Sequence, residues 1–226
     1  MYKRQHKHCY NSSVGDSAGG NLAAAVALKL RDDEFQPAIK MQVLLYPMLQ
    51  GLDFRLPSMM QCENAQLLPR RRLVFAVSLY LEGHSDNVEA YLNNNHVSPA
   101  VKKMKVPYID VTQLPSKYLV GYEKPSVETG NETMWNELKA KLLNPYFSPL
   151  VAERLDGLPL TCILTLEYDP LRDEGFLYAH RLINSGVKVV HAHADISIHG
   201  FLLFYESCEE AENIFQEITK FIAVNL

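Results

Sequence analysis

Hydrophobic and polar positions along the chain follow two alternating patterns. Short apolar runs that end at proline, aspartate or glycine are typical of buried strands, whereas apolar residues spaced three and four apart are typical of helices with one buried face. Strands and helices therefore alternate, which predicts an α/β protein with a mainly parallel sheet. The predicted strands are residues 9–14, 41–46, 160–168 and 187–193, and the predicted helices are residues 22–30, 176–185 and 209–224.

Residues 50–145 do not follow this alternation. They mix aromatic residues, scattered prolines and short helical patterns such as residues 73–81. We therefore expect one α/β domain over residues 1–226, with a helical insertion at about 50–145 that covers the edge of the sheet as a cap.

Two helix ends carry recognisable signals. Gly186 follows the helix predicted at 176–185, where glycine is the usual residue after a helix end. Ser207 and Glu210 have the spacing of a capping box, which predicts the start of the last helix. The first predicted strand is less regular, because Ser12 and Ser13 stand where a buried parallel strand usually carries Val, Ile or Leu.

Composition narrows the classes of function. The chain has 226 residues, 47% of them hydrophobic, so it is long and apolar enough to form a folded core. A net charge of −4 argues against nucleic acid as a partner. The 4 cysteines lack the spacing of metal ligands, and we expect no metal site and no cofactor. The first eight residues are basic and polar, unlike a signal peptide or a membrane span.

The stretch 14–21, Val-Gly-Asp-Ser-Ala-Gly-Gly-Asn, contains the Gly-x-Ser-x-Gly pattern of a nucleophile elbow. In such an elbow, a sharp turn between a strand and a helix exposes the serine, here Ser17. Gly15 and Gly19 flank it because a side chain would collide where the strand and helix approach each other. The N-terminus of the following helix favours a developing oxyanion, with the Ala18 backbone N–H as a donor. The alternative is a glycine-rich helix start in which Ser17 is an ordinary N-cap residue.

Two further residues follow predicted strands. Asp169 comes directly after the strand at 160–168, and His199 comes after the strand at 187–193. Because functional residues gather at the carboxyl ends of parallel strands, we expect Ser17, Asp169 and His199 to meet. The order Ser, Asp, His is that of α/β-hydrolases. Asp169 stands before Pro170, so by itself it also fits a turn residue that ends a strand.

Several motifs resemble the hormone-sensitive lipase family of α/β-hydrolases, and most closely its arylacetamide deacetylase and neutral cholesterol ester hydrolase branch. The resemblance implies hydrolysis of lipid, acetyl or arylacetamide substrates by the triad Ser17, Asp169 and His199, without a cofactor. It also implies an amino-terminal anchor in the endoplasmic reticulum membrane for full-length members. The motifs are Gly-Asp-Ser-Ala-Gly-Gly-Asn-Leu-Ala at 15–23, Val-Leu-Leu-Tyr-Pro at 43–47, Asp-Pro-Leu-Arg-Asp-Glu-Gly at 169–175 and His-Gly at 199–200.

The sequence departs from the family pattern in two further places. The family carries a His-Gly-Gly-Gly loop that completes the oxyanion hole upstream of the elbow, and no such stretch occurs here. We therefore expect the sheet to lack its N-terminal strands. Before His199, Ser197 replaces the family's glycine and Ile196 its acidic residue, so the loop that carries the histidine is expected to differ.

The sequence thus predicts a serine carboxylic ester hydrolase that acts on a small, lipophilic ester through an acyl-enzyme. Membrane association is expected only through a segment absent from this chain. The alternative is a catalytically impaired, truncated product or a non-enzymatic, ligand-binding relative. Because oxyanion donors and half of the sheet are missing, we expect weak or absent activity and a tendency to aggregate.

Overall fold

The computed structural model describes residues 12–104, 108–124 and 129–226. Its strands are β1 (Ser12–Asp16), β2 (Met41–Leu45), β3 (Leu160–Tyr168) and β4 (Val189–Ile198). They form a parallel sheet in the order β1-β2-β3-β4. The α-helices are α1 (Ala18–Asp32), α2 (Pro57–Gln61), α3 (Arg70–Glu82), α4 (Val88–Leu92), α5 (Pro99–Met104), α6 (Glu132–Leu142), α7 (Arg172–Asn184) and α8 (Glu209–Asn225). Short 3-10 helices are η1 (Val111–Gln113), η2 (Ser116–Leu119), η3 (Pro149–Val151) and η4 (Phe201–Phe204).

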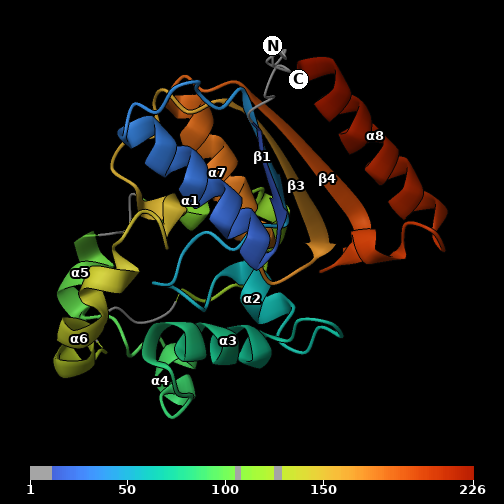
Figure 1. Cartoon of the computed structure of the whole chain (residues 1–226). Helices are drawn as coiled ribbons and strands as arrows, with labels where there is room; N and C mark the ends of the chain where they lie inside the picture. Colours follow the sequence, from blue (N-terminus) through green and yellow to red (C-terminus); the bar gives the residue numbers. More distant parts are fainter. Residues whose placement is uncertain (1–11, 105–107, 125–128) are drawn as a thin grey trace.

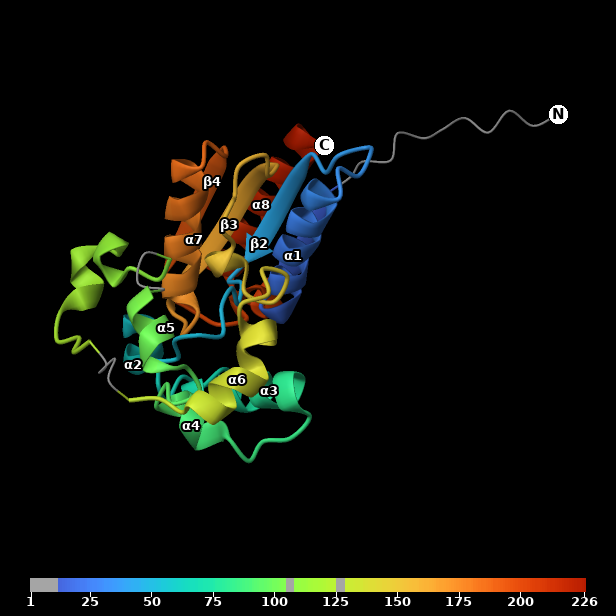
Figure 2. The same cartoon turned by 90° about the vertical axis from the view of Figure 1, so that its left-hand side faces the viewer.

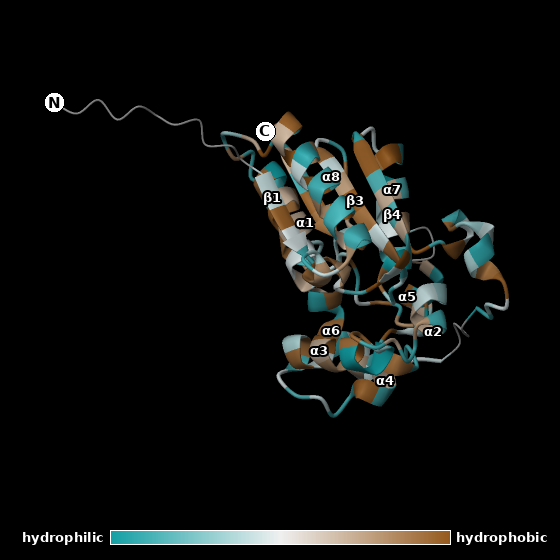
Figure 3. Cartoon of the chain, turned by 90° about the vertical axis from the view of Figure 1, so that its right-hand side faces the viewer, coloured by the Kyte–Doolittle hydropathy of each residue, from teal (hydrophilic) through white to brown (hydrophobic). Residues whose placement is uncertain are grey.

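Helices cover both faces of the sheet. Figure 1 shows α1 and α7 on one side and α8 on the other. Side chains of a strand point alternately to the two faces, so Leu44 and Ile163 belong to the core under α1 and α7, whereas Val43 and Leu164 belong to the core under α8. The surface of α8 that faces away from the sheet is largely hydrophilic (Figure 3). The predicted α/β architecture with a parallel sheet is confirmed.

β1 forms despite its polar sequence. It spans residues 12–16 rather than 9–14, and residues 9–11 lie outside the described part of the chain. Within the described residues β1 pairs only with β2, and Val14 is 50% exposed. A strand at the edge of this sheet does not need the continuous apolar sequence of a strand buried on both sides.

Several predicted boundaries are wrong. α1 and α7 each begin four residues before the helices predicted at 22–30 and 176–185. β4 continues to Ile198 instead of ending at 193, because its last residues still follow β3, where Tyr168 pairs with Ile198. Exposed positions such as Ile196 interrupt the hydrophobic pattern there without interrupting the strand. The last helix begins at Glu209 as predicted, but its N-cap is Cys208 and no side chain caps it, so the capping box predicted at Ser207 and Glu210 is absent.

The segment between β2 and β3 folds over the carboxyl ends of the strands. Figures 1 and 2 show α2, α3, α4 and α6 together beyond that edge of the sheet. A separate apolar core holds these helices together, with Phe54, Tyr91 and Leu142 fully buried in it. No helix in the described residues is long and apolar enough to cross a membrane.

Candidate active site

Ser17 lies in a strained turn between β1 and α1. Its φ of 54° and ψ of −121° lie outside the conformations that a non-glycine residue usually adopts. A Cβ on Gly15 would lie 2.1 Å from the Gly19 carbonyl oxygen, and a Cβ on Gly20 would lie 2.8 Å from the Pro47 Cβ. The glycines therefore allow the helix to approach both the strand before it and the segment after β2.

Backbone hydrogen bonds hold this turn on both sides. The Ser17 N–H donates to the Leu45 carbonyl at 2.9 Å, and the Ser17 carbonyl accepts from the N–H of Met48 at 3.2 Å. The Asn21 side-chain amide then donates to the carbonyls of Met48 at 2.9 Å and Phe147 at 2.8 Å. The end of β2 and the segment after it thus fix the position of Ser17.

The structure brings Ser17, His199 and Asp169 together. His199 Nε2 lies 2.9 Å from Ser17 Oγ, and His199 Nδ1 lies 2.8 Å from Asp169 Oδ2. Asp169 is fully buried, and its other oxygen accepts from the Leu171 N–H at 2.8 Å. A buried carboxylate that accepts from Nδ1–H leaves the Nε2 lone pair facing the serine hydroxyl.

Tyr46 is a site residue that the sequence reasoning did not identify. Its ring packs edge-on against the His199 imidazole, with the centroids 5.1 Å apart and the planes at 70°. Tyr46 also has a positive φ of 38°, which turns the chain at the end of β2. The resemblance of residues 43–47 to a family motif marked this position, but no local pattern indicates contact with a histidine so distant in the sequence.

His199 follows β4 directly. Because β4 reaches Ile198, Ser197 lies in the strand and is buried, with its hydroxyl donating to the Ala194 carbonyl at 2.7 Å. The expected loop before His199 is therefore replaced by strand. Gly200 then adopts a left-handed conformation with φ 75° and is the N-cap residue of η4.

An apolar cavity of about 260 Å³ opens beside Ser17. Ala18 and Leu22 from α1 line one side of it, and Leu73, Val77 and Tyr80 from α3 line the other. Tyr80 stacks on Phe147, which also lines the cavity, with the ring centroids 5.6 Å apart. The cavity thus lies between the serine and the helices that follow β2.

Two buried carboxyl groups lie behind the triad, in the first turn of α7. Asp173 and Glu174 precede the helix predicted at 176–185, but the structure places them in its first turn, where both are fully buried. Burial raises the pKa of Glu174 to about 8, against hydrogen bonds from Leu49 and Gln50 that lower it. Burial likewise raises the pKa of Asp173, although the neighbouring Arg172 lowers it.

A polar cluster connects β3, β4 and η2 outside the triad. Glu167 accepts hydrogen bonds from Tyr118 at 2.6 Å and Lys117 at 3.2 Å, and lies 2.9 Å from His193 Nε2. Burial raises the pKa of Glu167, but these hydrogen bonds together lower it to about 2. Glu167, His193 and Asp195 each offer one atom that could bind a metal ion, and these three atoms lie within 4.8 Å of one another. The Lys117 ammonium compensates the charge of Glu167, and the Tyr118 hydroxyl donates to the same carboxylate.

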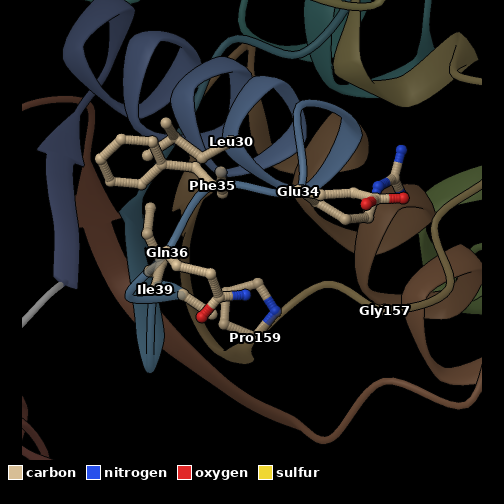
Figure 4. A pocket seen from close by; sticks show the side chains of 10 residues that line it. Leu30, Glu34, Phe35, Gln36, Ile39, Gly157 and Pro159 are labelled. Carbon is tan, nitrogen blue, oxygen red and sulfur yellow. The ribbon is translucent and has the colours of Figure 1, made fainter.

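A second cavity, of about 340 Å³, lies beyond the end of α1, near the start of β2. Figure 4 shows Leu30, Phe35, Ile39 and Pro159 around it. None of the three residues of the triad lines this cavity. It is therefore separate from the candidate active site.

Comparisons with known proteins agree with this fold. A family model described as alpha/beta hydrolase fold matches residues 12–140 and 97–203. The chain is 41% identical to neutral cholesterol ester hydrolase 1 of Mus musculus over 84% of its own length and 48% of the relative's, and 37% identical to arylacetamide deacetylase of Bos taurus over the same shares. It thus spans about half the length of the curated relatives it matches.

Solved esterase structures are similar as well. The chain is 30% identical to the hyperthermophilic esterase from Pyrobaculum calidifontis, with a TM-score of 0.51 over 92% of this chain and 50% of that one. A bacterial heroin esterase is 25% identical, with a TM-score of 0.58 over 91% of this chain and 48% of that one. With its parallel sheet, its strand-turn-helix serine and a family match over most of its length, the chain belongs to the α/β-hydrolase fold family.

Proposed function

We propose that this chain carries the catalytic centre of a serine ester hydrolase, with Ser17 as nucleophile, His199 as general base and Asp169 as the residue that orients the base. The observation that carries the proposal is the continuous hydrogen-bonded relay from Ser17 Oγ through His199 to Asp169. Both the esterase structures and the curated hydrolases to which the chain is similar support ester hydrolysis as the reaction.

The geometry supports an acyl-enzyme mechanism. His199 Nε2 takes the hydroxyl proton as Ser17 Oγ attacks the ester carbonyl carbon, and Asp169 stabilises the resulting imidazolium. The tetrahedral intermediate expels the alcohol, which receives the proton from Nε2. Water then attacks the acyl-enzyme with His199 again as base, which releases the acid and restores the serine.

The Ala18 N–H is the oxyanion donor that we assign to this chain. Ala18 is the first residue of α1, and donors in the first turn of a helix have no partner within the helix. The helix N-terminus adds a favourable partial charge. Removing one oxyanion donor lowers kcat by about 10²–10³, which is the size of the contribution that we assign to the Ala18 N–H.

We further propose that the substrate is a small, lipophilic ester. The cavity beside Ser17 is lined mainly by apolar side chains, including Leu22, Leu73 and Val77. The transfer of a hydrophobic acyl or alcohol group from water to such a surface lowers the free energy of binding. The names of the relatives, a cholesterol ester hydrolase and an arylacetamide deacetylase, are consistent with lipophilic substrates. Residues 50–145 would act as the cap, since α3 supplies one wall of the cavity.

The test is hydrolysis of p-nitrophenyl butyrate together with covalent labelling by a fluorophosphonate, located by mass spectrometry. We expect turnover and a label on Ser17, both lost in Ser17→Ala. Ser85→Ala, in a turn after α3, is the matched control and should keep both. A folded wild-type chain that neither hydrolyses the ester nor takes the label would contradict the proposal and favour a ligand-binding relative.

A further inference from the structure

We propose that Glu174 is a positioning residue for the catalytic serine, which it holds through residues 48–50. This inference rests on the proposed function, because it names a residue that the same site needs. Glu174 contacts neither Ser17 nor His199 in any described hydrogen bond, so its effect on the reaction would be indirect.

The Glu174 carboxyl group binds one short segment with both of its oxygens. Oε2 accepts from the backbone N–H of Leu49 and, at 3.2 Å, from the backbone N–H of Gln50. Oε1 accepts from the Gln50 side-chain amide at 2.9 Å. Gln50 in turn accepts from the N–H groups of Leu52 and Asp53, each at 2.7 Å. One side chain of α7 therefore determines the course of the backbone after β2.

Met48, which precedes the two residues bound by Glu174, holds the catalytic serine in place. The Met48 N–H donates to the Ser17 carbonyl, and the Met48 carbonyl accepts from the Asn21 side chain. Because Met48 is covalently joined to Leu49, a shift of residues 49–50 is transmitted to Ser17 and to the first turn of α1. Met48 also lines the apolar cavity, so the same segment forms part of the substrate site.

The energetics argue against a role in stability alone. Glu174 is fully buried, and among the residues described it forms no ion pair. Burying a carboxyl group without a counterion is costly, and hydrogen bonds from neutral donors offset only part of that cost. An apolar side chain would avoid the cost but would leave the backbone donors of Leu49 and Gln50 unsatisfied. The carboxyl group is therefore suited to fixing these two donors in one position.

Asp173 provides a matched control. It is the neighbouring residue in the same turn of α7 and is equally buried, but it accepts from the Ser58 N–H at 2.7 Å and from Arg172 at 3.0 Å. Its contacts therefore lead to α2 and not to the segment that holds Ser17. Asp173→Asn perturbs a buried carboxyl group without releasing residues 48–50.

The experiment compares Glu174→Gln, Glu174→Asp and Asp173→Asn with the wild type. It measures kcat and KM for p-nitrophenyl butyrate per labelled serine, at a temperature well below each unfolding midpoint. We expect both Glu174 variants to lower kcat about 10- to 100-fold, with KM changed less than about 3-fold, because small misplacements of reacting groups cost that much. Asp173→Asn should keep kcat within about 3-fold of the wild-type value, even if its unfolding midpoint falls as far as the midpoints of the Glu174 variants. Glu174→Asp keeps a carboxyl group but shortens its reach, so a loss of kcat in this variant would show that the position of the carboxyl group matters and not only its presence.

Amide hydrogen exchange separates this proposal from the proposed function. We expect the Glu174 variants to lose protection in residues 15–22 and 46–52, and Asp173→Asn to lose it near residue 58. If the wild type lacks both activity and label, the proposed function fails, and exchange alone decides whether Glu174 holds the turn. Unchanged exchange in residues 15–22, unchanged kcat, or an equal loss of kcat in Asp173→Asn would overturn the inference.

Discussion

His199 Nε2 lies 2.9 Å from Ser17 Oγ, although 182 positions separate the two residues in the sequence. Ser17 follows β1 and His199 follows β4, so the parallel sheet carries both to the same edge. Asp169, which follows β3, completes the relay from the neighbouring strand. The alignment of strand ends is therefore what assembles the site.

Asp169→Asn should lower kcat strongly with little change in KM. An amide in place of the carboxylate no longer stabilises the imidazolium and favours the wrong tautomer of His199. The corresponding change in a serine protease triad lowers kcat about 10⁴-fold, and we expect a loss of similar order. Steady-state kinetics with p-nitrophenyl butyrate would measure it. Asp156→Asn, at an exposed position before β3, should leave kcat unchanged.

Gly15→Ala should prevent the elbow from forming, because its Cβ would lie 2.1 Å from the Gly19 carbonyl oxygen. Gly83→Ala is the comparison: it has a positive φ of 79° but open space around its Cβ position. We expect Gly83→Ala to lower the unfolding midpoint by about 3–6 °C, from conformational strain alone. The midpoint of Gly15→Ala should fall at least twice as far. Equal midpoints for the two variants would show that the close approach of β1 and α1 is dispensable.

Tyr80→Ala should change the choice of acyl chain. Tyr80 lines the cavity beside Ser17 and stacks on Phe147, so its removal takes apolar surface from one wall. We expect the ratio of kcat/KM for p-nitrophenyl octanoate to that for the acetate to fall about 10-fold. Tyr205→Ala, whose ring packs on Phe215 in α8, is the control. A ratio that stays constant in Tyr80→Ala would place the acyl chain elsewhere.

Glu167→Gln should destabilise the protein at neutral pH and lose this effect in acid. The pKa of Glu167 is lowered to about 2 from an ordinary value of 4.5, so the ionised form stabilises the folded state above pH 4.5. That contribution is lost as the pH falls toward 2. Thermal unfolding of both proteins from pH 7 to pH 3 would show their midpoints converging. Divergence toward acid would contradict the role of Lys117 and Tyr118 as partners of an ionised Glu167.

The difference in thermal stability between the wild type and Glu174→Gln should depend on pH in the opposite direction to that for Glu167→Gln. The pKa of Glu174 is raised to about 8 from an ordinary value of 4.5, because burial disfavours the charged form. The protonated form therefore stabilises the folded state below pH 4.5, and this contribution is lost as the pH rises through 8. Relative to Glu174→Gln, the wild type should thus lose thermal stability between pH 5 and pH 9. A constant difference across this range would show that Glu174 does not titrate there.

Local sequence patterns determined the elements that present the triad. The glycines around Ser17 predicted a strand-turn-helix, and α1 follows the serine directly, beginning at Ala18, before the alanine-rich run predicted as helix. The strand predicted at 160–168 matches β3, so Asp169 was placed at a strand end. Because parallel strands align their carboxyl ends, these local features and the order Ser, Asp, His were sufficient to predict that the three residues would meet.

The tertiary structure alone decided the surroundings of the triad. Glu174 was marked only as part of the family motif at 169–175, yet it is buried against Leu49 and Gln50, more than a hundred positions away. Tyr46 packs on His199, and Tyr80 lines the cavity from α3. The spacing of hydrophobic residues along the chain predicts neither contact. Hydrophobic periodicity records which face of an element is buried, whereas the partner of a buried side chain depends on how separate elements pack. Local patterns in the chain therefore set which residues stand at the strand ends, whereas the packing of separate elements sets what holds them there.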